Sequence, residues 1–120
     1  MYAGGMSELM ERTEALSVAS KLFRGFADRT RLSILVELSE GERRVTDLVT
    51  SLGGSQGNIS GHLRCLRDCG LVTDRPAGRE VFYRIAHPEV IEVIRSAETL
   101  LGLTGPAVDL CSNYVGGSKQ

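Results

Sequence analysis

Apolar residues recur at helical spacing in five stretches of this chain of 120 residues. Residues at i, i+3, i+4 and i+7 form one face of an α-helix, so each stretch predicts an amphipathic helix. Residues that begin helices stand at the expected places: Ser7, Asp28 and Ser55 as N-caps, and Pro88 at a first helical position. The predicted helices cover residues 7–26, 29–39, 45–52, 56–69 and 88–101.

The period changes to an alternation between residues 71 and 85. Residues 71–73 and 80–85 predict short strands, and residues 74–78, which include Pro76 and Gly78, predict the turn between them. A Gly53-Gly54 break joins the third and fourth predicted helices as in a helix-turn-helix. The order of four helices, a hairpin and a last helix predicts a mainly α fold, a winged helix-turn-helix with a small β-hairpin. Its apolar last helix predicts a partner surface.

Length and composition predict one domain. With 42% hydrophobic residues, the chain can bury a modest core. We expect the domain to cover residues 1–103 and a tail, residues 104–120, to follow it. No apolar run approaches the roughly 18 residues of a membrane span, and the N-terminal residues lack the layout of a secretory signal. These observations predict a cytoplasmic protein without a membrane partner.

The distribution of charge along the chain is more informative about DNA binding than the net charge is. The net charge of −1 argues against a strongly basic nucleic-acid binder. Between residues 55 and 84, however, five arginines stand against three acidic residues, a local excess of two positive charges. The fourth predicted helix also offers side chains that hydrogen-bond base edges, and the hairpin offers arginines for phosphates. The candidate contacts to double-stranded operator DNA are Ser55, Gln56, Asn58, Ser60, His62 and Arg64 on the helix, and Arg75, Arg79 and Arg84 on the hairpin.

Two of the three cysteines lie on this same helix, at i and i+4. Side chains at that spacing approach closely enough to share one ion, whereas Cβ atoms about 5–6 Å apart are too distant for an unstrained disulfide. Thiolates are soft donors that favour Cd(II), Pb(II), Hg(II) or Cu(I). The alternative for Cys65 and Cys69 is an ordinary core role, since cysteine is often buried. His62 is better interpreted as a DNA contact than as a ligand.

Three segments resemble the ArsR/SmtB family of dimeric, metal-responsive repressors. They are ADRTRLSILVEL at residues 27–38, NISGHLRCLRDCGLV at residues 58–72 and GREVFYRI at residues 78–85. Arg29 stands where the family usually has proline. The resemblance implies a homodimeric DNA-binding repressor and not an enzyme. No group that would activate a cysteine as a nucleophile accompanies the thiols, which agrees with this interpretation.

Within the family, the cysteines resemble those of the cadmium- and lead-responsive members. The cysteine pair of the arsenic sensors is absent from residues 42–48, and residues 88–101 lack the histidines of the zinc sensors. The resemblance implies that Cys65, Cys69 and Cys111 bind Cd(II) or Pb(II), with Zn(II) possible, and that Cys111 comes from the partner subunit. The tail is long enough to reach either subunit. The alternative is a repressor that senses oxidation through its thiols.

Overall fold

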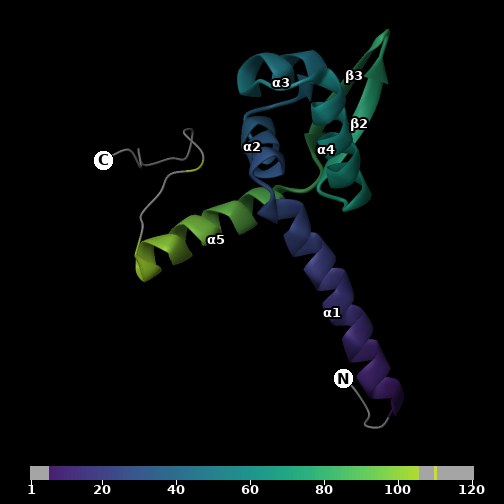
Figure 1. Cartoon of the computed structure of the whole chain (residues 1–120), viewed down its shortest axis with the longest axis vertical. Helices are drawn as coiled ribbons and strands as arrows, with labels where there is room; N and C mark the ends of the chain where they lie inside the picture. The colour runs from purple at the N-terminus through teal and green to yellow at the C-terminus, as the bar shows by residue number, and fades with distance from the viewer. Residues whose placement is uncertain (1–5, 106–109, 111–120) are drawn as a thin grey trace.

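The predicted order of four helices, a hairpin and a last helix is confirmed, and a two-residue strand is added between the second and third helices. The computed structural model describes residues 6–105 and residue 110, so Cys111 and most of the predicted tail lie outside the described residues. Figure 1 shows the arrangement, and most helix boundaries agree with the predicted ones within about three residues. The elements are α1 (Met6–Ala27), α2 (Arg29–Leu38), β1 (Arg43–Arg44), α3 (Val45–Leu52), α4 (Gln56–Asp68), β2 (Val72–Ala77), β3 (Glu80–Ile85) and α5 (Pro88–Thr104).

Local signals explain where most of the helices begin and end. The Asp28 carboxylate accepts the N–H of Arg31 at 3.0 Å, and so caps α2. Ser55 Oγ accepts the N–H of Asn58 at 3.0 Å, and so caps α4. Pro88 occupies the first position of α5, as predicted. The prediction for α1 is wrong at its start, because this helix begins at Met6 and Ser7 lies inside it.

The sheet differs from the prediction in two respects. Strand β2 continues through residues 74–77, which pair with residues 80–83, so the predicted turn over residues 74–78 is wrong. Pro76 is tolerated because β2 is an edge strand in the order β1-β3-β2. The sequence also missed β1, whose Arg43 and Arg44 pair with Tyr83 and Phe82. Two residues are too few for an alternation to be seen.

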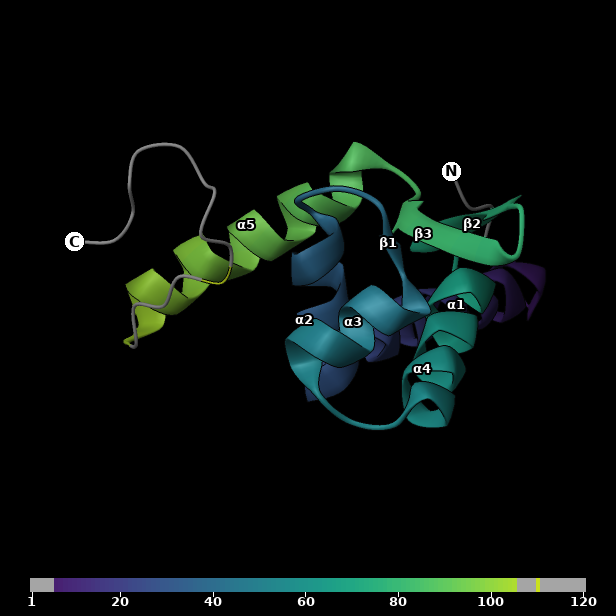
Figure 2. The ribbon, with the colours of Figure 1, turned by 90° about the horizontal axis from the view of Figure 1, so that it is seen from above.

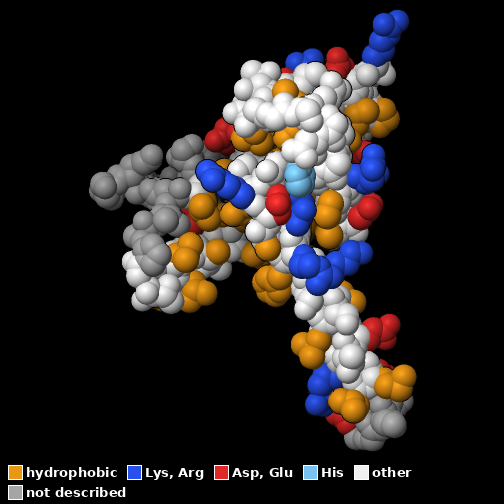
Figure 3. Space-filling model, in the orientation of Figure 1, with side chains coloured by type: hydrophobic (Ala, Val, Ile, Leu, Met, Phe, Trp, Pro, Cys, Tyr) orange, Lys and Arg blue, Asp and Glu red, His pale blue; other side chains and the backbone are white. Residues whose placement is uncertain are grey.

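The core lies between α2, α3, α4, the sheet and the start of α5. Figure 2 shows α2, α3 and α4 grouped beside the sheet, while α5 runs away from them. Helix α1 projects from this body, and apolar side chains of α1 and α5 reach the surface (Figures 1 and 3). None of the described helices is both long and apolar enough to cross a bilayer. The buried core residues are Ile34, Leu35, Leu38, Leu48, Ile59, Leu63, Leu66, Leu71, Val72, Val90 and Ile94.

Two glycines at α4 should respond in opposite ways to the same substitution. Gly70 follows the helix with φ +80°, a conformation that costs an L-residue roughly 1–2 kcal/mol. Gly61 lies inside α4, where a β-carbon would point into open space, and alanine there gains about 1 kcal/mol of helix propensity. We expect Gly70→Ala to lower the free energy of unfolding in urea and Gly61→Ala to raise it. Equal effects of the two substitutions would contradict this assignment.

Candidate functional site

The first turn of α4 presents polar side chains to solvent. Ile59, Leu63 and Leu66 are buried, which fixes the opposite face of α4 outward. The turn before α4 depends on glycine, since Gly53 and Gly54 have φ values of +84° and +90°. The N-terminal end of α4 is therefore free to contact another molecule, and this is the end at which the second helix of a helix-turn-helix contacts base edges. The exposed residues at this end are Ser55, Gln56, Gly57 and Asn58.

The rest of the predicted reading face is less uniform. Arg64 is exposed and Ser60 is half-buried. His62 is not in the exposed half of the helix as predicted, because its side chain is only 21% exposed and its Nδ1 lies 3.8 Å from Oδ2 of Asp28. The N–H of Arg31 is the main cause that lowers the pKa of Asp28, and His62 adds to it. His62 thus faces the N-terminus of α2 rather than open solvent.

The local excess of positive charge between residues 55 and 84 is partly neutralised by an acidic residue from outside this segment. Arg75 donates to both carboxylate oxygens of Glu42, at 2.9 and 2.8 Å, and Arg84 Nε lies 4.0 Å from the same carboxylate. Arg79, at the tip of the hairpin, is exposed and forms no ion pair with any described residue. Figure 3 shows a basic side chain extending from this tip. Sequence reasoning missed Glu42, which lies 33 residues before Arg75.

An ion pair fixes the start of α3, the first helix of the helix-turn-helix. Asp47 accepts the backbone N–H of Arg44 at 2.9 Å, and one of its oxygens accepts from the Arg44 guanidinium at 2.9 Å. These hydrogen bonds lower the pKa of Asp47 from 3.8 to about 2. Arg44 also lies 3.6 Å from Glu80 on β3, so the helix start is tied to the wing.

This pair predicts a contribution to stability that depends on pH. A carboxylate whose pKa is lower in the folded state stabilises the fold above its unfolded pKa, and that stabilisation is lost as the pH falls from about 4 to about 2. We expect the urea midpoint of Asp47→Asn to be lower than that of wild type at neutral pH and to approach it at acid pH. Glu11→Gln is the control, because Glu11 is exposed and forms no ion pair within the described residues. A constant difference between Asp47→Asn and wild type across this range would contradict the assignment.

The two cysteines of α4 lie one helical turn apart beside α1. The N–H of Cys69 donates to the carbonyl of Cys65 at 3.0 Å, so the helical spacing continues through Cys69. Both side chains are half-buried. A β-carbon added to Gly25 of α1 would lie 3.7 Å from Sγ of Cys69 and 2.9 Å from Cδ1 of Leu71. Glycine at position 25 therefore permits the close approach of Leu71, just after α4, to α1, and Cys69 lies at ordinary contact distance from the same position.

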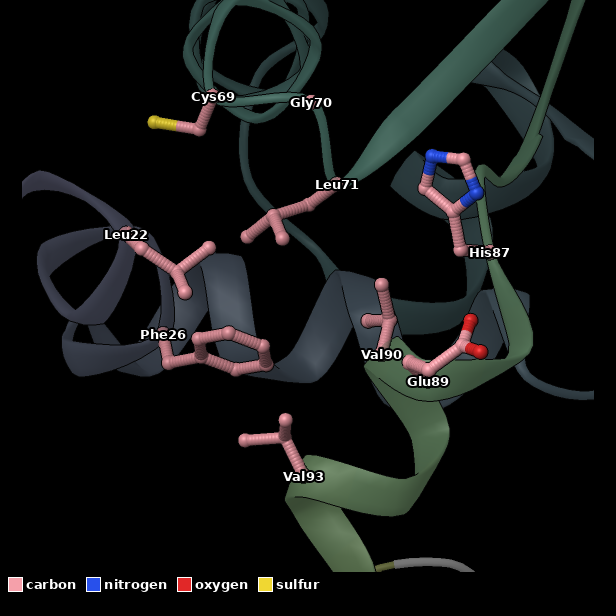
Figure 4. Close-up of a pocket in the computed structure, with 9 residues that line it drawn as sticks. All are labelled: Leu22, Phe26, Cys69, Gly70, Leu71, His87, Glu89, Val90 and Val93. Carbon is pink, nitrogen blue, oxygen red and sulfur yellow. The ribbon is translucent and has the colours of Figure 1, made fainter. Parts of the chain in front are cut away.

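Cys69 also borders a largely apolar pocket of about 320 Å³ between α1, the end of α4 and α5. Figure 4 shows its sulfur on the side of the pocket formed by α1, opposite His87 and Glu89. Burial, and next the adjacent Cys65, raise the pKa of Cys69, while Lys21 and Arg31 oppose this shift. A free thiol is therefore the resting form at neutral pH. The residues around the pocket are Leu22, Phe26, Cys69, Gly70, Leu71, His87, Glu89, Val90 and Val93.

The described residues contain two free thiols at ligand spacing but not a complete metal site. No group of three or more His, Cys, Asp or Glu side chains that could hold an ion occurs among them. The Cys65–Cys69 pair suits a soft ion, because thiolates one turn apart can converge on it. A third thiolate would have to come from Cys111, which lies outside the described residues.

Comparisons with known proteins agree with this arrangement. The family model "Bacterial regulatory protein, arsR family" matches residues 28–74. The chain is 36% identical over 101 residues to a probable mercury resistance operon repressor of Streptomyces lividans, covering 84% of this chain and 81% of that protein. It is 38% identical over 90 residues to the HTH-type transcriptional regulator CmtR of Mycobacterium tuberculosis, covering 69% of this chain and 76% of that protein.

A solved structure extends the match to nearly the whole fold. It is the homodimeric winged helix-turn-helix DNA-binding domain of a possible ArsR-family regulator from Mycobacterium bovis, with a TM-score of 0.74 and 27% identity over 85% of this chain and 92% of that chain. The fold and the site define a winged helix-turn-helix regulator of transcription, not an enzyme. The chain belongs to the ArsR family of bacterial repressors, also called ArsR/SmtB.

Proposed function

We propose that this protein is a cytoplasmic, dimeric repressor that binds operator DNA in its metal-free form and releases it when Cd(II) or Pb(II) binds Cys65, Cys69 and Cys111. The observation that carries the proposal is that the thiol pair and the candidate DNA contacts lie on one element, α4 with the residues that cap it. Cys65 is seven positions after Asn58, about 10 Å along a helix. A change in the position of α4 caused by the ion would therefore move the reading surface.

Exposed apolar side chains support the dimer. A helix face of this kind is usually covered by another surface. Phe23 of α1 and Val93 and Leu100 of α5 border one groove, which places both helices beside the same surface. The similar M. bovis domain is itself homodimeric. The exposed apolar residues of these helices are Leu9, Met10, Leu16, Val18, Leu22 and Phe23 on α1, and Val93, Leu100 and Leu103 on α5.

The position of Leu110, the residue before Cys111, favours a ligand that crosses between subunits. Its N–H donates to the Glu98 carboxylate on α5, and its side chain packs against the core. Helix α5 runs to the far side of α2 from α4, and the views in Figures 1 and 2 agree on this. This placement supports donation of a thiolate to Cys65 and Cys69 by Cys111 of the partner subunit.

The ion can act only by binding the two states of the protein with different affinity. Cys69 lies in van der Waals range of Gly25 of α1, so an ion bound at Cys69 would alter how the end of α4 packs against α1. By linkage, operator DNA must weaken Cd(II) binding by the same factor by which Cd(II) weakens DNA binding. Three thiolates favour Cd(II) or Pb(II), whereas Zn(II) usually takes a fourth ligand.

A Cd(II) titration of the protein–operator complex tests this function. An operator duplex is first selected from a random-sequence library with metal-free protein, and release is followed by fluorescence anisotropy together with ultraviolet thiolate-to-metal absorption. We expect dissociation and absorption to rise together with Cd(II) and Pb(II), and to require more Zn(II). Absorption without dissociation would contradict the repressor mechanism, and release by peroxide in metal-free buffer, reversed by reductant, would favour oxidation sensing instead.

A further inference from the structure

The outward face of the sheet formed by β1, β3 and β2 carries three arginines beside Phe82. The register pairs Phe82 on β3 with Arg44 on β1 and with Arg75 on β2, so these three side chains lie on one face. Arg84 is two residues from Phe82 and shares that face. The opposite face carries Val72 and Ile85, which pack in the core, so the arginines point away from it.

One carboxylate from outside the hairpin holds two of these arginines. Glu42 precedes β1 and accepts from Arg75 Nε at 2.9 Å and from its terminal nitrogen at 2.8 Å. Arg84 Nε lies 4.0 Å from the same carboxylate. Glu42 is 29% exposed, and Arg75 and Arg84 are more than half exposed. The carboxylate and the two guanidinium groups therefore form an accessible cluster rather than a buried one.

The bond between Glu42 and Arg75 has the geometry of an arginine–phosphate contact. Carboxylate and phosphate both accept two parallel N–H bonds from a guanidinium group. Phe82 supports Arg75 from beneath, with the guanidinium carbon 5.0 Å from the ring centroid, so the group keeps its position without Glu42. Glu42 lies in the α2–β1 connection, next to Gly41 with φ +146°, so its side chain can withdraw while the hairpin stays in place.

We propose that Glu42 competes with DNA phosphates for Arg75 and Arg84, and so limits the affinity and the salt dependence of operator binding. The inference rests on the proposed DNA-binding function but not on metal sensing. An exposed ion pair is comparable in strength to a single phosphate contact, so Glu42 keeps Arg75 and Arg84 from making their full set of phosphate contacts in the wild-type complex. In the free protein Arg79 at the wing tip is unpaired within the described residues, so it can meet the duplex first.

The test compares Glu42→Gln with wild type on the selected operator, with chelator present and between about 50 and about 200 mM KCl. Glu11→Gln on α1 is the control, because it makes the same change in net charge far from the wing. Thermal unfolding of each variant shows whether the fold is retained. We expect Glu42→Gln to bind roughly two- to fivefold more tightly than the control. Its slope of log affinity against log salt should be steeper by about 1–2, one unit for each additional phosphate contact.

Arg75→Ala, made in the wild type and in Glu42→Gln, distinguishes a Glu42 that competes with DNA for Arg75 from a Glu42 that positions Arg75 for DNA. If Glu42 competes, Arg75→Ala weakens binding more in the Glu42→Gln background than in wild type. If Glu42→Gln instead matches the control in affinity and slope, or binds more weakly because Glu42 positions Arg75, the proposal is wrong. Failure of the wild type to bind any duplex would overturn the repressor function as well. If the wild type binds the operator and Cd(II) releases it, but Glu42→Gln has the same affinity and slope as the control, only the proposed competition is wrong.

Discussion

Replacing Cys65 or Cys69 with serine is expected to preserve operator binding and to raise strongly the Cd(II) concentration needed for release. Each substitution removes one of three thiolates, and hydroxyl oxygen is a poor donor for a soft ion. If a thiolate site is worth about 10 kcal/mol or more in total, loss of one ligand raises the Cd(II) concentration for release by about 100-fold or more. Anisotropy of the labelled operator during a Cd(II) titration measures this shift.

Two further variants make the cysteine result specific. If the tail supplies the third ligand, Cys111→Ser should need as much Cd(II) for release as Cys65→Ser and Cys69→Ser do. If that ligand comes from the partner subunit, a mixed dimer of Cys111→Ser with Cys65→Ser should regain one of its two metal sites. His62→Gln is the matched control, since His62 lies on the same helix three residues before Cys65 and faces Asp28 instead. It should respond to Cd(II) as wild type does. If all three serine variants release DNA at wild-type Cd(II) concentrations, the thiol site is not the sensor.

Replacing both Gln56 and Asn58 with alanine is expected to reduce operator affinity by about 100-fold or more. A good bidentate contact between an amide side chain and a base contributes about 1–3 kcal/mol of discrimination, and both residues are exposed at the reading end of α4. Ser55 still caps the helix through the backbone N–H of residue 58, so the fold is retained. Binding to the selected operator and to a scrambled duplex, measured at one salt concentration, gives the specificity ratio.

The salt dependence distinguishes this loss from a loss of phosphate contacts. Base contacts release few counterions, so the slope of log affinity against log salt should stay at the wild-type value. Thr99→Ala on α5 is the control, because it removes an exposed polar side chain far from α4. A double variant that keeps the wild-type specificity ratio would place the reading surface elsewhere on the protein. A changed slope with an unchanged ratio would assign Gln56 and Asn58 to the phosphate backbone.

The sequence by itself determined the helices, the helix-turn-helix break and the hairpin. Helical periodicity and the caps at Asp28 and Ser55 act between residues three or four positions apart, so neighbouring residues suffice to predict them. The same local spacing predicted that Cys65 and Cys69 lie one turn apart. Pro76 misled the prediction of β2, because proline within a strand is tolerated at a sheet edge and the sequence does not say which strand is at the edge.

The tertiary structure alone decided which charges and which faces are free. Glu42 and Arg75 are 33 residues apart, and the pairing of β3 with both β1 and β2 brings them into contact. The local excess of positive charge along the chain is therefore partly neutralised. His62 lies beside Asp28 because α2, which Asp28 caps, packs against α4. Leu71 approaches α1 closely because Gly25 has no side chain. These contacts depend on the path of the whole chain, which a local pattern does not specify.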